Sequence, residues 1–450
     1  MMAEKNVRYI AKPGSRINGE VRVPGDKSIS HRSIMLGSLA DGETRIKGFL
    51  TGADSVATLN AFREMGVEIS DPNGEEIIIK GVGVDGLKAA RSPLDLGNSG
   101  TSMRLLSGLL AGQEFDSVLI GDSSLSKRPM KRVTLPLKEM GSVIETTENG
   151  TAPLKISGNN NLKPISYDMP LASAQVKSCL LLAGIYAEGE TTVIEPAPTR
   201  DHTERMLAGF SYKIDGKSGI KKDGSKVTIC GGGRLQGCDI DVPADISSAA
   251  FFMVAATIAR DSELLLQHVG INPTRTGVID ILKLMGADIT LENRKEIGGE
   301  EIADIRVRSA SLKGIDIPEE LVPLAIDEFP VIFIAAAAAG GTTRLSGAEE
   351  LRVKESDRIE VMVNGLQAVG IDAQGTPDGA VIVGGVIKGG RVHSHEDHRI
   401  SMSFSIASLI AEGEIIIEDC ANVETSFPGF VKTAQQLGVC LEEQAGEASK

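Results

Sequence analysis

Six segments of the chain repeat one pattern: an apolar run at helical spacing, a strand, and a second run that ends in Gly. The apolar runs read HRSIMLGSLA, SMRLLSGLLA, AQVKSCLLLAG, SAAFFMVAATIA, PVIFIAAAAAG and ISMSFSIASLIA. The second runs end in REMG (63–66), KEMG (138–141), RMLAG (205–209), KLMG (283–286), QAVG (367–370) and QQLG (435–438). A repeat of roughly 65–85 residues is too long for a solenoid and too short for a usual domain. The pattern therefore predicts one folding unit used six times.

The first repeat shows the local signals. Residues 28–39 are apolar at helical spacing, and a strand is expected to start at Thr44. Asp54 is placed to cap the next helix. Gly66 suits the end of that helix, because Gly takes left-handed φ at low cost.

The apolar runs also predict the arrangement of the chain. A helix that is apolar on all sides must be buried, so six of them suggest two bundles of central helices with sheets outside, an α/β fold. Proline-containing strand ends at 22–24 and 241–243 bracket three repeats. We therefore expect one lobe at 24–242, the other at 1–23 plus 243–450, and hinges near 22–25 and 241–244.

Composition narrows the class of protein. Hydrophobic residues make up 41% and charged residues 24%, which is ordinary for a soluble globular protein. The net charge of −14 disfavours nucleic-acid or anionic-membrane partners. The longest apolar stretch, 331–339, is far shorter than a membrane span, and Met1 to Asn6 carry no signal-peptide pattern. Five cysteines without a C-x-x-C pair indicate reduced thiols, so we expect a cytoplasmic protein.

Polar and charged residues recur where the apolar helices are expected to begin. PGDKSISHRS (24–33) and LGNSGTSMR (96–104) each place a turn with Gly before a helix start that carries Lys or Arg. Helix N-termini attract anions, and added cations strengthen this. The remaining motifs are SLSKRPMKR (124–132), PLASAQVKS (170–178), TRDHTE (199–204), AIDEFP (325–330), LRVKESDR (351–358) and SHEDHR (394–399). If both lobes direct these helix starts at one cleft, the cleft suits substrates with several phosphates or carboxylates.

Each motif also has a structural interpretation. Capped helices, solvated basic runs and capping carboxylates would explain them one at a time. His393, His395 and His398 invite a metal site, but no Cys or further His lies nearby, and we expect no metal.

Taken together, PGDKSISHR, LGNSGTSMR, KRPM, SAQVKS, IDEFP, RVKESDR and DHR resemble the 5-enolpyruvylshikimate-3-phosphate (EPSP) synthase family. The resemblance covers nearly the whole chain, and KRPM, SAQVKS and TRDHTE look like its class II branch. It implies the enolpyruvyl transferase fold, a two-lobe inside-out α/β barrel with three βαβαββ units in each lobe. It also implies the transfer of the enolpyruvyl group of phosphoenolpyruvate to the 5-hydroxyl of shikimate 3-phosphate, with release of phosphate and without a cofactor. We further expect a monomer.

The resemblance also implies roles for residues. Those expected to hold shikimate 3-phosphate are Lys27, Ser28, Arg32, Ser173, Ala174, Gln175, Arg200, Asp327 and Lys354. Those expected to hold phosphoenolpyruvate are Lys27, Asn98, Gly100, Arg128, Gln175, Arg358 and Arg399. Asp327 would accept the hydroxyl proton and Glu355 would handle the proton at the methylene carbon, but the sequence leaves open whether Lys27 or Glu355 is the acid.

One position bears on the herbicide glyphosate, which occupies the phosphoenolpyruvate site in this family. A larger side chain at position 100 accompanies tolerance, so Gly100 suggests sensitivity. Leu105, where many sensitive members carry Pro, and the class II features suggest tolerance. The sequence leaves this alternative open.

Two other functions are weighed against this one. The sister family that acts on UDP-N-acetylglucosamine shares the fold, but it has a Lys-Asn pair where this chain has Lys27-Ser28. It also carries a reactive Cys in the first lobe, whereas no Cys here precedes Cys179. A non-catalytic anion-binding protein on the same fold would not need Asp327 and Glu355.

Overall fold

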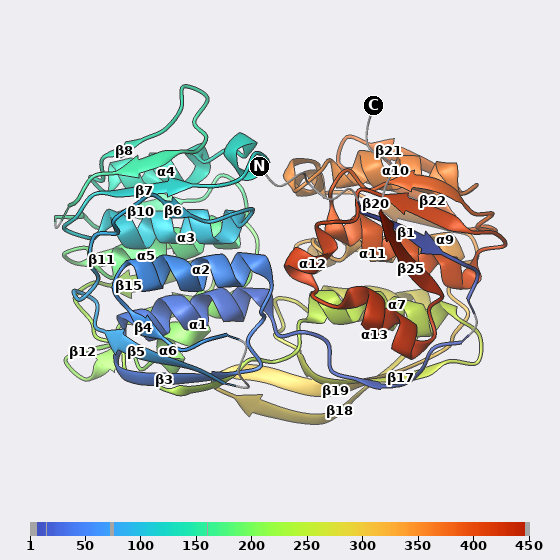
Figure 1. Cartoon of the computed structure of the whole chain (residues 1–450), viewed down its shortest axis with the longest axis horizontal. Helices are drawn as coiled ribbons and strands as arrows, with labels where there is room; N and C mark the ends of the chain where they lie inside the picture. The colour runs from blue at the N-terminus through green and yellow to red at the C-terminus, as the bar shows by residue number, and fades with distance from the viewer. Residues whose placement is uncertain (1–6, 15, 73–75, 160, 446–450) are drawn as a thin grey trace. The chain divides into compact units, whose positions relative to one another are not determined.

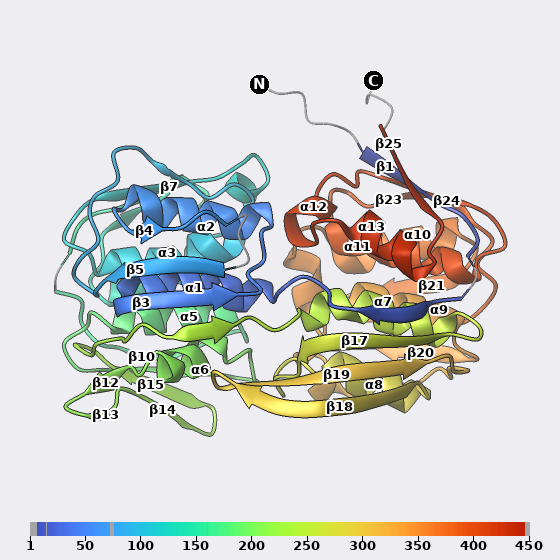
Figure 2. The same ribbon diagram turned by 60° about the horizontal axis from the view of Figure 1, so that its bottom comes forward.

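The computed structural model of the chain describes residues 7–14, 16–72, 76–159 and 161–445 (Figures 1 and 2). Within them the chain forms two compact units. Unit 1 comprises the described residues of Met1–Pro24, Pro243–Lys295 and Glu301–Lys450. Unit 2 comprises those of Gly25–Val242 and Glu296–Glu300, so a short piece from the second half of the sequence groups with the first.

Unit 2 is built around three apolar helices, α1 (Lys27–Leu39), α3 (Gly100–Ala111) and α5 (Ala174–Gly184). Every residue of α1 is buried from Ile29 onward, and every residue of α5 from Val176 onward. Figure 1 shows the three helices inside the unit, where α3 packs against both α1 and α5. The second helices of the repeats are α2 (Ala53–Glu64), α4 (Lys131–Glu139) and α6 (His202–Gly209).

Three four-stranded sheets accompany these helices, and each repeats one strand order. In each sheet, the first strand lies at the edge and is parallel to the second, which follows a buried helix. The second strand is antiparallel to the third, and the third is antiparallel to the fourth. The sheets are β16 (Asp239–Asp241), β3 (Asp41–Lys47), β5 (Glu76–Val82), β4 (Glu68–Ile69); β6 (Leu94–Asp95), β7 (Ser117–Ile120), β9 (Leu154–Ile156), β8 (Ile144–Glu145); and β10 (Ser166–Asp168), β11 (Glu190–Ile194), β15 (Lys226–Cys230), β14 (Ile220–Asp223). A small hairpin, β12 (Lys213–Ile214) with β13 (Lys217–Ser218), extends the last repeat.

Unit 1 repeats the plan with α7 (Ile246–Ile258), α9 (Phe329–Ala338) and α11 (His398–Ala407), which contact one another. Its other helices are α8 (Gly277–Met285), α10 (Arg358–Ala368), α13 (Phe430–Leu437) and the short α12 (Val423–Ser426). The sheets, in strand order, are β2 (Asn18–Val21), β17 (Glu263–Gly270), β19 (Glu300–Arg308), β18 (Asp288–Ile297); β20 (Thr342–Leu345), β22 (Gly379–Val383), β21 (Asp372–Thr376); and β23 (Gly390–His393), β24 (Ile415–Glu418), β1 (Val7–Ala11), β25 (Leu441–Ala445).

The start of the chain completes the sixth repeat. In the first repeat β5 lies between β3 and β4, and in the sixth the same middle position, between β24 and β25, is filled by β1. β1 is antiparallel to both neighbours, with Tyr9 opposite Ile417 and Glu443. Two segments from opposite ends of the sequence therefore share one sheet of unit 1.

The six apolar runs and the six Gly-ended runs are all helical, as predicted. Gly66 follows α2 with φ of 90°, which is the left-handed conformation expected there. The third repeat differs, because Gly209 is the last residue of α6 and Ser211 takes the positive φ instead. The predicted cap at Asp54 is wrong: Gly52 is the N-cap of α2, and Asp54 lies in the first turn.

The buried apolar residues form two separate clusters, one in each unit. Both consist mainly of Leu, Ile, Val, Ala and Met, as a chain with 3% aromatic residues requires. Phe252, Phe427 and Phe430 are an exception, since their rings pack together in unit 1. Among the described residues no helix combines the length and apolar character needed to cross a bilayer.

The contact between α3 and α5 gives a stability prediction. A Cβ at Gly108 would lie 2.0 Å from the backbone oxygen of Cys179, so the helices cannot stay at this distance around a larger residue. We expect Gly108→Ala to lower the free energy of unfolding by about 1–3 kcal/mol, the usual effect of overpacking. Denaturant unfolding followed by circular dichroism measures this.

The control for this substitution is Gly385→Ala. Gly385 is exposed, and its nearest atom to a new Cβ is 3.7 Å away, an ordinary contact. If the two variants unfold at the same denaturant concentration, the close approach of α3 and α5 does not limit stability.

Candidate active site

The first turns of α1, α3 and α5 carry most of the side chains expected to bind substrate in unit 2. Their N-caps are Asp26, Ser99 and Ser173, and each side chain accepts a hydrogen bond from a backbone N–H of its own first turn. The remaining N–H groups of these turns leave partial positive charge at each helix start. Anionic ligands are therefore favoured at this end of the three helices.

Lys27 is the first residue of α1, and its side chain forms an ion pair with Asp54 of α2. The two side chains are 26% and 8% exposed. Asp54 lies inside the first turn of α2, and its carboxylate pairs with a full positive charge from the neighbouring helix. Lys27 was predicted from the sequence, but its partner Asp54 was not. Ser28, the next expected residue, is half-buried.

Three residues expected to bind phosphoenolpyruvate lie together. Arg128 donates from Nη2 to Oδ1 of Asn98 at 2.5 Å. A Cβ at Gly100 would lie 3.2 Å from Nη1 of Arg128, so the guanidinium sits directly over this glycine. Asn98 in turn donates from Nδ2 to Asp122 at 2.7 Å. Asp122 was missed by sequence reasoning, because no motif links it to Asn98.

Gln175 lies where α3 and α5 meet. Its Oε1 accepts a hydrogen bond from Arg104, and its Nε2 donates to Oγ1 of Thr101 at 3.0 Å. Arg104 was noted in the LGNSGTSMR motif but was not assigned a role. These contacts hold the amide of Gln175 in one orientation.

Arg32 is more enclosed than expected of a residue that touches a ligand. It is 4% exposed, and its Nε, Nη1 and Nη2 donate to Thr203, to the backbone oxygen of Ser28 and to Ser178, at 2.7, 3.0 and 2.8 Å. Burial lowers the pKa of Arg32 to about 10, so the guanidinium is still charged at neutral pH. Its clearest role in the structure is to connect α1 with α5 and α6.

The other expected residues of unit 2 are half-buried. Ser173 and Ala174 lie at the start of α5, and Arg200 lies in the segment just before α6. The basic residues that follow η1 (Leu125–Lys127) differ in their surroundings. Arg128 contacts Asn98, whereas Lys131, the first residue of α4, is exposed.

Arg358 is the centre of the residues expected to form the site in unit 1. It is the first residue of α10 and is 2% exposed. Its Nε donates to Asp397 at 2.9 Å, its Nη2 to Glu355 at 2.6 Å and its Nη1 to Asp327 at 3.2 Å. Burial opposes its charge, but these carboxylates raise the pKa of Arg358 above its usual value. Arg358, Glu355 and Asp327 were predicted from the sequence, whereas Asp397, which caps α11, was missed.

Lys354 and Arg399 also lie beside carboxylates of unit 1. Nζ of Lys354 is 3.7 Å from Asp327 and 3.5 Å from Glu350. Nη1 of Arg399 is 4.0 Å from Glu328, whose side chain is 1% exposed. Glu328 accepts a hydrogen bond from Ser247 as well, so it holds the starts of α7, α9 and α11 together.

Two groups can be removed from the candidate acids and nucleophiles. Burial, with Lys27 nearby, lowers the pKa of His31 to about 3, so this imidazole is neutral near pH 7 and cannot serve as the acid. Cys179 is fully buried in α5, and burial raises the pKa of its thiol. Neither residue was assigned a catalytic role from sequence.

The histidines of the SHEDHR region do not form a metal site. The rings of His393 and His395 are 6.3 Å apart, and Nδ1 of His393 is 3.9 Å from Asp419. Among the described residues no group of three or more His, Cys, Asp or Glu side chains could hold a metal ion.

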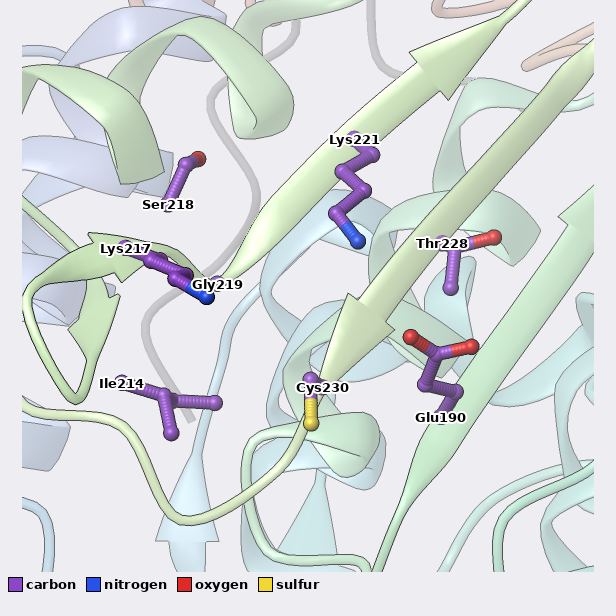
Figure 3. Close-up of a pocket in the computed structure, with 8 residues that line it drawn as sticks. All are labelled: Glu190, Ile214, Lys217, Ser218, Gly219, Lys221, Thr228 and Cys230. Carbon is purple, nitrogen blue, oxygen red and sulfur yellow. The ribbon is translucent and has the colours of Figure 1, made fainter.

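A small pocket of unit 2 is lined by other residues (Figure 3). It is formed between the β12–β13 hairpin and the sheet that contains β11, β14 and β15. None of the residues expected to bind substrate lines it. The lining residues are Glu190, Ile214, Lys217, Ser218, Gly219, Lys221, Thr228 and Cys230.

Relatives of known sequence and structure resemble the chain along its length. A 3-phosphoshikimate 1-carboxyvinyltransferase of Hydrogenovibrio crunogenus is 64% identical over 436 residues, which cover 96% of this chain and 98% of the relative. The enzyme of the same name from Methylococcus capsulatus is 63% identical over 98% of this chain and its own full length. A solved EPSP synthase of Acinetobacter baumannii is 56% identical, has a TM-score of 0.88, and covers 97% of this chain and 100% of its own.

The fold comparison agrees with the repeat pattern and with the predicted α/β class. The family model for EPSP synthase (3-phosphoshikimate 1-carboxyvinyltransferase) matches residues 11–434, nearly the whole chain and parts of both units. This match favours an EPSP synthase over the enzyme that acts on UDP-N-acetylglucosamine and over a non-catalytic anion-binding protein. The chain therefore belongs to the EPSP synthase family.

Proposed function

We propose that each unit supplies a separate share of the residues for the reaction of this family. The chain is a transferase of the shikimate pathway, which leads to the aromatic amino acids. It moves the 1-carboxyvinyl group of phosphoenolpyruvate to the 5-hydroxyl of shikimate 3-phosphate. The match of the family model to residues 11–434 is the observation that carries this function.

In the reaction one C–O bond forms at C2 of phosphoenolpyruvate, the C–O bond from C2 to phosphate breaks, and protons move at the hydroxyl and at C3. The 5-hydroxyl oxygen attacks C2 of phosphoenolpyruvate and loses its proton, while C3 gains a proton and becomes a methyl group. The C2–O bond to phosphate then breaks, phosphate leaves, and the methyl group loses a proton to restore the double bond. A base for the hydroxyl and a group that gives and then removes the proton at C3 are therefore required.

Unit 2 supplies mainly anion-binding groups. Lys27, Ser28, Ser173, Ala174, Gln175 and Arg200 would bind shikimate 3-phosphate, with Arg32 beside them. Lys27, Asn98, Gly100, Arg128 and Gln175 would bind phosphoenolpyruvate. This assignment is supported by the hydrogen bonds that join Arg128 to Asn98 and Gln175 to Thr101, and by three helix starts that favour anions.

Unit 1 supplies the proton-transfer groups. Asp327 is the base for the 5-hydroxyl, and Glu355 moves the proton at C3. Both carboxylates lie within hydrogen-bonding distance of one buried guanidinium, Arg358, which supports their action as a pair. Lys354 would bind shikimate 3-phosphate, and Arg358 and Arg399 would bind phosphoenolpyruvate, with the added anion sharing their charge.

Phosphate release tests the function directly. We expect release when phosphoenolpyruvate and shikimate 3-phosphate are both present, and none when shikimate 3-phosphate is replaced by UDP-N-acetylglucosamine or omitted. Release with UDP-N-acetylglucosamine alone as acceptor would contradict the proposal. Several expectations from the sequence stay predictions. They are the convergence of both units on one crevice, a monomeric state, the absence of nucleic-acid and membrane partners, and a cytoplasmic location.

Replacing Arg128 tests the phosphoenolpyruvate site. We expect Arg128→Ala to raise KM for phosphoenolpyruvate by about one to two powers of ten, the effect of one lost charged contact, with little change in KM for shikimate 3-phosphate. The matched control is Arg132→Ala in the same basic run. Steady-state kinetics with each substrate varied in turn measure both constants, and unchanged kinetics in Arg128→Ala would remove it from the site.

Replacing Asp327 tests the base. Asp327→Asn keeps the size of the side chain but removes its ability to accept a proton, so we expect kcat to fall by roughly 10²–10⁴-fold. The variant should still fold, because Asp397 and Glu355 continue to pair with the buried Arg358. Asp316→Asn is the control, because Asp316 is 79% exposed and pairs with Arg344 at the surface. Near-parent turnover in Asp327→Asn would exclude it as the base.

Replacing Gly100 tests the space beside Arg128. We expect Gly100→Ala to raise KM for phosphoenolpyruvate, because the new Cβ would lie 3.2 Å from Nη1 of Arg128 and must displace it. The inhibition constant for glyphosate should rise as well, since the family places that inhibitor in the same site. Inhibition curves against phosphoenolpyruvate give both values, and a lower inhibition constant would contradict this account of Gly100.

A further inference from the structure

A fully buried lysine in unit 2 has no role in the reaction described above. Lys177 lies on α5, one turn after its N-cap Ser173, and is 0% exposed. Its Nζ is 2.9 Å from Oε1 of Glu195 and 2.6 Å from Oε1 of Glu204. Both carboxylate side chains are buried too, at 3% and 8% exposed.

The two glutamates enclose the segment that carries Arg200. Glu195 directly follows β11, and Glu204 lies in the first turn of α6. The residues between β11 and α6 form neither helix nor strand, and Pro196 and Pro198 have no backbone N–H to donate. Two residues of this segment therefore cannot stabilise it through a backbone N–H group.

Glu195 makes side-chain contacts with this segment. Its Oε1 accepts hydrogen bonds from the backbone N–H and from Oγ1 of Thr199, at 3.1 and 2.5 Å. Lys177 binds the same oxygen. The position of Thr199, and hence of its neighbour Arg200, is in this way tied to the first turns of α5.

A second link runs beside the first. Arg32 donates from Nη2 to Ser178 and from Nε to Thr203, and Thr203 donates to Ser178 at 2.7 Å. Ser178 follows Lys177 in the sequence, and Thr203 precedes Glu204. Two buried cations, Lys177 and Arg32, thus connect α5 with α6 at adjacent positions.

Stability alone does not explain the lysine and its two carboxylates. Buried ion pairs can often be replaced by apolar residues at no cost in stability, because desolvation offsets the attraction. Within the described part of the chain, Oε1 of Glu204 is paired with Lys177, whereas its buried Oε2 accepts no hydrogen bond, which itself costs free energy. The buried cluster of one lysine and two glutamates is better explained by its effect on geometry. A fully buried Lys177 side chain fixes the distance between the start of α5 and the segment that carries Arg200.

We propose that Lys177 is a positioning residue for shikimate 3-phosphate. Through Glu195 and Glu204 it sets the position of Arg200 relative to Ser173, Ala174 and Gln175 at the start of α5. Lys177 itself does not contact the substrate. The inference rests on the proposed assignment of Arg200 and of residues 173–175 to this substrate.

The test compares the two substrates in Lys177→Met. We expect the dissociation constant of shikimate 3-phosphate alone to rise by about tenfold or more, as for one misplaced charged contact. KM for phosphoenolpyruvate at saturating shikimate 3-phosphate should change much less. Calorimetry suits the binding measurement, since the chain has no Trp. Lys222→Met, at an exposed lysine on β14, is the control that should leave both values unchanged.

A second variant separates geometry from charge. Lys177→Met leaves an extra negative charge near the site of an anionic substrate, which would weaken binding without any movement. The double variant Lys177→Met, Glu204→Gln removes one positive and one negative charge, so the net charge of the cluster is kept. We expect it to bind shikimate 3-phosphate as weakly as the single variant, and recovery to the parent affinity would overturn the proposal.

The remaining outcomes are also decisive. Parent-like binding in Lys177→Met, or an equal loss for both substrates, would contradict a positioning role. If Lys177→Met does not fold, the double variant is measured in its place, and if neither folds, Lys177 is structural and the proposal is wrong. Arg200→Ala is measured in parallel. If this variant binds shikimate 3-phosphate normally, the assignment of Arg200 to the site is wrong. If Arg200→Ala binds weakly but Lys177→Met binds normally, only the positioning role of Lys177 is rejected.

Discussion

The need to enclose central helices that are buried on nearly every side determines the structure of each unit. A helix such as α9, buried from Phe329 to Ala337, cannot lie on a surface, so it must be enclosed by other helices and by sheets. Each unit meets this requirement with three such helices and three main sheets. The same requirement explains why β1, from the start of the chain, completes the sheet of the sixth repeat.

Burial of these helices also determines where the chemistry can lie. Along most of their length they carry no group that a substrate could reach, so the polar side chains gather in the first turns and in the loops before them. In unit 2 those turns hold Lys27, Gly100 and Gln175, and in unit 1 Asp327 and Arg399 flank the starts of α9 and α11. A helix start supplies partial positive charge, which suits the phosphate and carboxylate groups of both substrates.

Buried and half-buried cations in both units form ion pairs with carboxylates. Arg358 is surrounded by three carboxylates, Lys27 is paired with Asp54, and Lys177 lies between two glutamates. In a water-poor interior such pairs are stronger and more costly to break than at the surface. Within each unit, these charged side chains are therefore held in fixed orientations by their partners.

The repeats could be predicted from the amino-acid sequence, as could the apolar helices, their Gly-ended companions and most of the residues proposed for the site, because periodicity and short motifs are local properties of the chain. Tertiary packing supplied the partners of these residues: Asp54 with Lys27, Asp122 with Asn98, and Asp397 with Arg358. It also decided that Gly52 caps α2, that Gly209 stays helical, and that Arg32 and Lys177 are enclosed. Each of these depends on which distant segments pack against one another, and no spacing along the chain encodes the distance between a side chain on one helix and a carboxylate on another.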